Sequence, residues 1–203
     1  MPYLIVFLLA YLIGTSNMAF YLAKWNKVDL RGGGSGNLGA SNATILMGWG
    51  AGVLVGIHDI GKSLVAVILA RLVFPEVEHI GAVAGVASVL GHIFPFYLKF
   101  KGGKGFASYL GMTLALNWKF AIVVLLLLAV VTWITDYIVA GTLTTIVVVP
   151  VYMGIAAHSA VLALILLVAT AVIAFKHREN FVRMYKGTEI RFRSASRGDH
   201  RVK

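Results

Sequence analysis

FAIVVLLLLAVVTWI, residues 120–134, contains no charged side chain. Such a run is stable in lipid, where a helix of about 20 apolar residues crosses a bilayer. Similar runs recur along the chain: 59% of its 203 residues are hydrophobic and only 13% are charged. A soluble domain could not bury this much apolar surface. The sequence therefore predicts an all-α integral membrane protein with a single transmembrane domain, residues 1–203.

Seven apolar runs are expected to form the transmembrane helices. The shortest, Phe106–Leu116, would cross only about half of a bilayer at ~1.5 Å per residue. A five-helix alternative, in which two short crossings are lost together, keeps the same distribution of charge. Residues 194–203 are expected to form a frayed basic tail. The seven runs are Tyr3–Ala23, Ala51–Phe74, Ile80–Leu98, Phe106–Leu116, Phe120–Ile134, Tyr137–Ile155 and Ser159–Phe175.

The basic residues predict the orientation of these helices. Fifteen of the 18 Lys and Arg residues fall in three segments, 24–50, 99–104 and 176–203. Seven helices put all three segments on one side, and cytoplasmic segments are the ones enriched in Lys and Arg. The N-terminus is therefore expected outside and the C-terminus in the cytoplasm. A net charge of +10 gathered in this way fits anionic lipid and phosphate esters better than nucleic acid.

A glycine-rich stretch in the first basic segment, GGGSGNLGASN at residues 32–42, is the first candidate site. Glycines permit positive φ, so successive backbone amides can point at one anion. A helix expected to begin near Ala43, capped by Ser41 or Asn42, would add its N-terminal dipole. A flexible Gly/Ser linker is the alternative interpretation.

Two nucleotide-binding patterns are rejected because each needs a preceding β-strand, and none is predicted. Residues 34–39 spell GxGxxG, and residues 56–63 spell a P-loop inside an apolar run. Within the second pattern, Asp59 and Lys62 are three apart and share a helical face. Charges inside a membrane helix are costly, so the two are expected to pair, or Asp59 anchors a basic residue of a site.

The second basic segment follows the third apolar run and places a Gly-Gly turn between lysines: GHIFPFYLKFKGGKG, residues 91–105. Lys101 and Lys104 offer ammonium groups to phosphate, and Gly102 and Gly103 let the backbone approach it. A short basic loop that only satisfies topology is the alternative. His92 is read either as a hydrogen-bonded structural residue or as a member of a site.

The third segment, KHRENFVRMYKGTE at residues 176–189, leaves the last apolar run. His177 and Asn180 are three apart and share a helical face. Glu179 and Arg183 are four apart and are expected to pair, which gives Glu179 a structural role. A juxtamembrane helix lying on anionic lipid is the alternative.

Together the three segments resemble the three motifs of the bacterial acyl-phosphate-dependent glycerol-3-phosphate acyltransferases, the PlsY family, in order and with the expected spacing. The resemblance implies transfer of a fatty acyl group from acyl phosphate to the 1-hydroxyl of glycerol 3-phosphate, giving lysophosphatidic acid and phosphate. It implies no cofactor or metal, a bacterial cytoplasmic (inner) membrane, an active site on the cytoplasmic face, and a functional link to an enzyme that produces acyl phosphate. Many members carry Arg where this chain has Ile45, and Ser41 replaces their usual Thr.

With no cysteine and no Ser-His-Asp arrangement evident in the sequence, direct attack without a covalent acyl-enzyme is hypothesised. Asn180 would orient the attacking hydroxyl or polarise the acyl carbonyl, and the base is either His177 or the leaving phosphate. The expected catalytic residues are Ser35, Lys104, His177 and Asn180, with Asp59, His92 and Glu179 as possible support. Acyl phosphate is assigned to Gly34, Ser35, Gly36, Asn37, Gly39, Asn42 and Lys104, and glycerol 3-phosphate to Lys101, Gly102, Gly103, Lys104 and His177.

Two other classes of protein share some of these features. A transporter of phosphorylated metabolites also uses basic residues and broken helices, but transporters bind near the bilayer midplane and often show two similar halves. No such halves are evident, and the polar segments here lie at helix ends. A noncatalytic scaffold leaves the glycine clusters unexplained.

Overall fold

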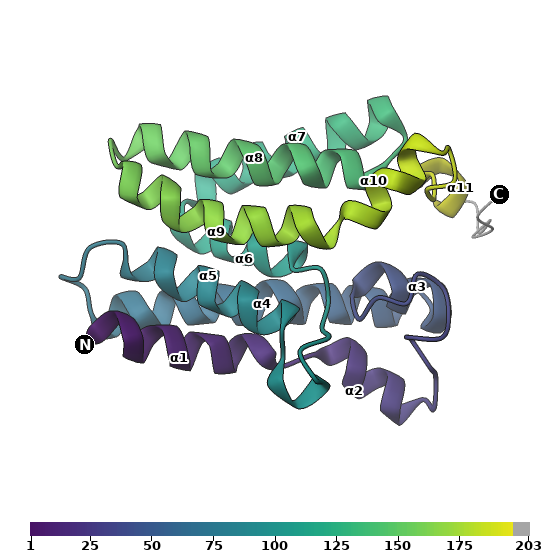
Figure 1. Cartoon of the computed structure of the whole chain (residues 1–203), viewed down its shortest axis with the longest axis horizontal. Helices are drawn as coiled ribbons and strands as arrows, with labels where there is room; N and C mark the ends of the chain where they lie inside the picture. Colours follow the sequence, from purple (N-terminus) through teal and green to yellow (C-terminus); the bar gives the residue numbers. More distant parts are fainter. Residues whose placement is uncertain (197–203) are drawn as a thin grey trace. The chain divides into compact units, whose positions relative to one another are not determined.

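The computed structural model describes residues 1–196, and every regular element in that range is a helix (Figure 1). The chain forms two compact units, Met1–Asn117 and Trp118–Lys203. Within residues 1–196, five helical segments are long and apolar enough to cross a membrane, and a bent helix pair can make a sixth. Most of their large apolar side chains on the outer faces remain exposed, as expected where lipid is the solvent.

The first unit contains six α-helices and one short 3₁₀ helix. In chain order they are α1 (Pro2–Thr15), α2 (Met18–Trp25), α3 (Ala40–Met47), α4 (Trp49–Val73), α5 (Ile80–Ile93), η1 (Phe96–Leu98) and α6 (Phe106–Leu116). The first candidate span, Pro2–Trp25, is interrupted between α1 and α2. Asn17 caps α2 by accepting a hydrogen bond from the Phe20 amide at 2.8 Å.

Small residues let the helices of this unit approach closely. Gly14 on α1 lies against the backbone of Ser88 on α5, and Gly111 on α6 lies against the carbonyl of Ile60 on α4. A side-chain carbon at either glycine would overlap the neighbouring backbone. In lipid, where apolar burial does not drive helices together, such contacts are a main source of association.

The second unit contains α7 (Trp118–Thr135), α8 (Ile138–Ala156), α9 (Ala160–Lys176), α10 (Arg178–Tyr185) and α11 (Phe192–Ser196). α8 packs against both α7 and α9 (Figure 1). α9 and α10 meet at a bend of 49°. α11 is held on the α7–α8 turn by Arg193, whose amide donates to Asp136 Oδ1 and whose guanidinium donates to the Trp133 carbonyl, both at 2.9 Å.

Each predicted run is helical, and the shortest, Phe106–Leu116, is helix α6, whose 11 residues extend about 17 Å as expected. Two other sequence-based expectations differ from this structure. The helix expected near Ala43 begins at Ala40, with Gly39 at its N-cap and no side-chain cap, so Ser41 and Asn42 do not cap it. Of the tail expected to be frayed, residues 194–196 belong to α11, and residues 197–203 lie outside the described part of the chain.

Candidate functional site

The glycine loop, residues 32–39, is organised by the buried side chain of Asn42. The Asn42 amide nitrogen donates to the carbonyls of Leu30 at 2.7 Å and Gly33 at 3.3 Å. Its Oδ1 accepts from the Ser35 amide at 2.8 Å. Asn42 was expected to contact acyl phosphate, but its donors and acceptor are engaged with the loop. Asn42 therefore shapes the glycine loop.

The loop conformation requires glycine at two positions. Gly34 and Gly36 have φ of 56° and 68°, in the left-handed region. A side-chain carbon at Gly34 would also overlap the Asn42 amide oxygen. Between these two glycines the Ser35 side chain is exposed. The predicted positive φ is thus confirmed, but the Ser35 and Gly36 amides, expected to face an anion, donate to Asn42 Oδ1 and the Gly33 carbonyl instead. The loop presents the Ser35 hydroxyl at its surface.

The lysine loop, residues 99–105, folds back on the end of α5. The Gly102 amide donates to the Ile93 carbonyl at 3.0 Å, and the Gly103 amide donates to the His92 carbonyl at 3.2 Å. These amides were expected to approach phosphate, and here they serve the loop instead. Anion binding by this loop consequently depends on the ammonium groups, with Lys101 exposed and Lys104 half-buried.

The two loops lie side by side in the first unit. The Arg31 guanidinium donates to the Lys101 carbonyl at 2.8 Å. A side-chain carbon built on Gly103 would lie 2.8 Å from the Leu38 carbonyl oxygen. Two segments about 65 positions apart in the sequence therefore meet, as predicted for the first and second motifs, and Arg31 joins them.

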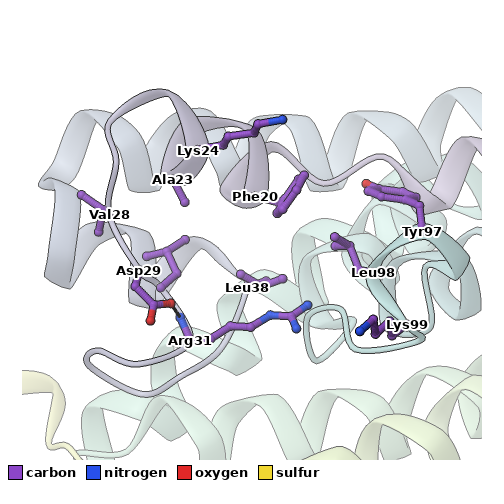
Figure 2. Close-up of a pocket in the computed structure, with 11 residues that line it drawn as sticks. Phe20, Ala23, Lys24, Val28, Asp29, Arg31, Leu38, Tyr97, Leu98 and Lys99 are labelled. Atoms are coloured by element: carbon purple, nitrogen blue, oxygen red, sulfur yellow. Dashed lines mark hydrogen bonds between the residues drawn. The ribbon is translucent and has the colours of Figure 1, made fainter.

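A cavity of about 480 Å³ opens beside this junction (Figure 2). Its charged lining has three cations, Lys24 from α2, Arg31 next to the glycine loop and Lys99 at the start of the lysine loop, and one carboxylate, Asp29. The rest is largely apolar and includes Phe20 and Leu98. Such a lining suits an amphiphile with an anionic headgroup.

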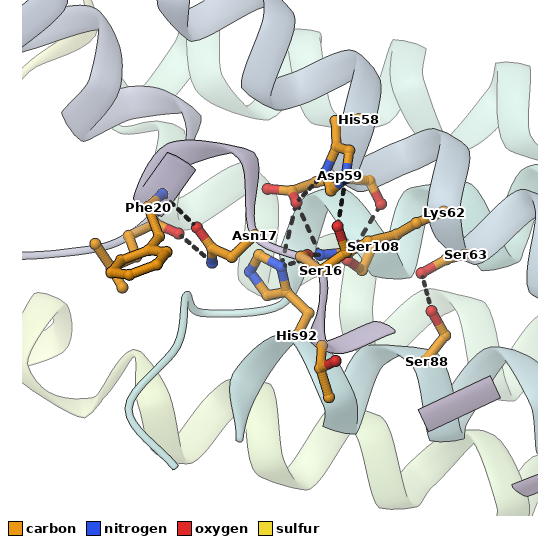
Figure 3. A network of polar contacts seen from close by, with 12 residues as sticks. Ser16, Asn17, Phe20, His58, Asp59, Lys62, Ser63, Ser88, His92 and Ser108 are labelled. Carbon is orange, nitrogen blue, oxygen red and sulfur yellow. Dashed lines mark hydrogen bonds and ion pairs between the residues drawn. The ribbon is translucent and has the colours of Figure 1, made fainter. Parts of the chain in front are cut away.

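A buried polar network adjoins the lysine loop at His92 (Figure 3). Asp59 and Lys62 form the predicted pair, with 2.9 Å between Lys62 Nζ and Asp59 Oδ1. His92 joins them, its Nδ1 lying 2.8 Å from Lys62 Nζ. His92 is therefore hydrogen-bonded within the protein, as the first of its two interpretations predicted. The contact between Lys62 and His92 was not predicted, because no sequence spacing relates residues on different helices.

The third motif forms its own cluster in the second unit. His177 lies at the bend between α9 and α10, and His177 and Asn180 are both buried. The Asn180 amide donates to Glu189 Oε1 at 2.7 Å. Arg183 Nε donates to Glu189 Oε2, also at 2.7 Å.

The predicted pair of Glu179 and Arg183 is wrong. Arg183 pairs with Glu189, whose side chain is only 8% exposed, while Glu179 is 73% exposed and lies near Arg178. The chain turns back after α10 at Gly187, which has φ of 70°, and this turn brings Glu189 to the helix. Helical spacing could not predict the role of Glu189, because this residue lies beyond the end of α10. The one signal in the sequence was Gly187, two residues earlier, which indicates a turn.

Within residues 1–196 no group of three or more His, Cys, Asp or Glu residues could hold a metal ion. At the site of the family's usual Arg, Ile45 lies near Gly34: a side-chain carbon on Gly34 would be 3.5 Å from Ile45 Cγ2. The position adds apolar packing under the glycine loop and no charge.

Comparison with known proteins gives a consistent result. A family model described as glycerol-3-phosphate acyltransferase matches residues 4–187. A glycerol-3-phosphate acyltransferase of Coxiella burnetii (strain CbuG_Q212) is 39% identical over 191 residues, covering 93% of this chain and 97% of the relative. One from Prochlorococcus marinus (strain MIT 9301) is 36% identical, covering 93% and 96%.

Two solved structures have the same fold. The crystal structure of PlsY (YgiH), an integral membrane glycerol 3-phosphate acyltransferase, in its glycerol 3-phosphate form matches with a TM-score of 0.89 at 32% identity, over 97% of this chain and 98% of that one. Its lysophosphatidic acid form matches with a TM-score of 0.85 at 31% identity, over 94% and 95%.

Proposed function

The chain belongs to the glycerol-3-phosphate acyltransferase family, and we propose that its acyl donor is acyl phosphate. It is a multi-pass membrane acyltransferase that produces lysophosphatidic acid. The observation that carries the choice of donor is the junction of the glycine and lysine loops. The phosphate of acyl phosphate is bonded directly to the reacting carbonyl, so this donor needs an anion site next to the glycerol 3-phosphate site. The phosphates of acyl-CoA lie a long pantetheine arm away from its thioester, so that donor would not use such a neighbouring pair of sites.

The glycine loop and the cavity beside it are assigned to the donor. The phosphate of acyl phosphate would lie at Gly34–Gly39, with the exposed Ser35 hydroxyl as a hydrogen-bond donor and Lys104 as counter-charge. Gly36, Asn37 and Gly39 complete the loop, and Asn42 holds its shape. Arg31, which already joins the two loops, is the cation available where the family's Arg is replaced by Ile45.

Glycerol 3-phosphate is assigned to the ammonium groups of Lys101 and Lys104 together with His177. Gly102 and Gly103 contribute through loop geometry, because their amides are bonded to α5. Lysine suits the task because its ammonium is a mobile point charge with three donors.

The hydrogen bonds of the second unit suggest how attack occurs. His177 Nδ1 lies 2.8 Å from the Ile173 carbonyl, which can only accept, so Nδ1 carries a proton and Nε2 of the neutral ring is the basic nitrogen. Glu189 likewise accepts from Asn180 Nδ2, which fixes the Asn180 carboxamide. We assign Asn180 to orienting the glycerol hydroxyl and His177 to accepting its proton.

In the proposed reaction the 1-hydroxyl oxygen forms a bond to the acyl carbonyl carbon. The carbon–oxygen bond to phosphate then breaks, and inorganic phosphate leaves with the bonding pair. The hydroxyl proton passes to His177 Nε2. No acyl-enzyme forms. The developing oxyanion would be stabilised by the cations that hold the donor.

Purified protein incubated with acyl phosphate and glycerol 3-phosphate is expected to release lysophosphatidic acid and phosphate. Acyl-CoA at the same concentration is the control donor and is expected to be inert. Turnover of acyl-CoA alone would overturn the proposed donor. Full turnover by an Asn180→Ala variant would remove Asn180 from the mechanism.

The proposal places this reaction in the bacterial cytoplasmic membrane, with seven crossings, the N-terminus outside and the active site on the cytoplasmic face. Positive-inside charge supports this orientation. Because acyl phosphate is a reactive mixed anhydride, the donor must come from an enzyme that makes it nearby.

A further inference from the structure

Asp59, Lys62 and His92, here called the Asp59 cluster, form a buried group in the first unit (Figure 3). Their side chains are 2%, 4% and 3% exposed, respectively. Charges within membrane helices are costly. A buried ion pair also contributes little net stability, since apolar residues of similar size often serve the fold equally well. Folding alone therefore does not explain the cluster.

Lys62 and Asp59 together hold the His92 ring. Lys62 Nζ lies 2.6 Å from the Ser16 carbonyl, 2.9 Å from Asp59 Oδ1 and 2.8 Å from His92 Nδ1. Asp59 Oδ1 also lies 3.3 Å from His92 Nδ1. The Nδ1 side of the ring is therefore held by the ammonium and the carboxylate, and the Nε2 side faces Gly103.

His92 connects this cluster to the lysine loop in two ways. Its carbonyl accepts the Gly103 amide at 3.2 Å. Its ring lies against the same residue, since a side-chain carbon on Gly103 would overlap His92 Nε2. The rotation of the ring and the path of the loop are therefore interdependent.

The far end of the loop is tied to the same point on α4. Ser108, in the first turn of α6, donates its hydroxyl proton to the Asp59 carbonyl at 3.2 Å. One turn of α4 thus holds the loop at two points: at Gly103, between Lys101 and Lys104, through His92, and after the last lysine through Ser108.

We infer that the Asp59 cluster positions the lysine loop for glycerol 3-phosphate, with Lys62 as a positioning residue that nothing in the sequence assigned to the site. Asp59 and Lys62 hold the His92 ring, and the ring and backbone of His92 hold Gly103. None of the three is assigned a contact with substrate. The inference rests on the proposed function in taking this loop as the glycerol 3-phosphate site.

The deciding variant is the double substitution Asp59→Leu and Lys62→Met, which removes both charges and leaves an apolar core. We expect it to fold, because neither charge is left uncompensated. The KM for glycerol 3-phosphate is expected to rise about tenfold or more, with a smaller change in the KM for acyl phosphate. Amide hydrogen exchange across residues 99–105 is expected to accelerate in the same variant.

Ser63→Ala is the matched control. Ser63 is buried next to Lys62 and bonds Ser88 Oγ at 2.8 Å, without a link to the lysine loop. It is expected to leave both measurements unchanged. Should the double variant fail to fold, His92→Asn gives the same test, because it keeps an acceptor near Lys62 and removes the ring edge from Gly103.

The inference would be overturned by a folded variant in which amide hydrogen exchange of residues 99–105 and the KM for glycerol 3-phosphate both match the wild type. The cluster would then have a purely structural role. Failure of the proposed function looks different. In that case the wild-type protein does not use acyl phosphate, whereas the exchange of residues 99–105 still reports whether the cluster holds the loop.

Discussion

At the scale of single residues, the polar side chains near the site mainly hold other parts of the site. Asn42 uses its amide on the glycine loop, and Glu189 uses both oxygens on Asn180 and Arg183. Each of these side chains is buried among its partners. Their substitution should therefore act on turnover through geometry rather than through lost substrate contacts.

Glu189→Gln is expected to lower kcat/KM by about 10- to 100-fold, because the Asn180 carboxamide and Arg183 lose a charged acceptor and a small displacement of a reacting group is costly. Steady-state assays with acyl phosphate as donor measure this. Glu179→Gln is the matched control, since its carboxylate is 73% exposed and is expected to retain wild-type kinetics. Equal losses in the two variants would contradict the assignment of Glu189.

The sequence indicated the residues to which we assign the chemistry more readily than the residues that hold them in place. Ser35, Lys104, His177 and Asn180 stand out because glycines, lysines and paired polar groups are rare at the ends of apolar runs. Local spacing correctly paired Asp59 with Lys62 but wrongly paired Glu179 with Arg183. The contacts of Lys62 with His92 and of Arg31 with Lys101 join distant segments, and no local periodicity encodes them.

At the scale of elements, α6 depends on its contact with α4. Its 11 residues are too few to be stable alone in a membrane, and Gly111 allows its backbone to approach Ile60. The apolar runs predicted each helix because hydropathy is local. Hydropathy could not predict the break in α1–α2 at Ser16, where Lys62 satisfies the carbonyl.

Gly111→Ala is expected to destabilise the first unit by about 1–3 kcal/mol, because the added methyl group meets backbone that cannot rotate away. A thermal unfolding scan in detergent should give a lower Tm than the wild type. Gly61→Ala on α4 is the control, since a side-chain carbon there meets nothing within 4 Å. An unchanged Tm for Gly111→Ala would mean that α6 is not packed as described.

At the scale of the whole molecule, the proposed function requires α6 to cross the membrane. If it does, the chain crosses seven times, and residues 24–50, 99–104 and 176–189 share the cytoplasmic side. If it does not, every segment after Asn117 changes sides. The lysine loop and the cluster of His177 and Asn180 would then face different compartments, and they could not bind one substrate together.

Single cysteines decide between these topologies, since the chain has none of its own. With seven crossings, Glu76→Cys and Ala157→Cys react with an impermeant thiol reagent added to intact cells, while Lys27→Cys and Lys186→Cys react only after the membrane is opened. All four positions are exposed. With six crossings, Glu76→Cys is still reactive and Lys27→Cys is still protected, as with seven. Ala157→Cys, however, becomes protected and Lys186→Cys becomes reactive. The charge of the last segment favours the first pattern, because it carries nine basic residues. Reactive Lys186→Cys beside protected Lys27→Cys would exclude a shared site and, with it, the mechanism proposed for this enzyme.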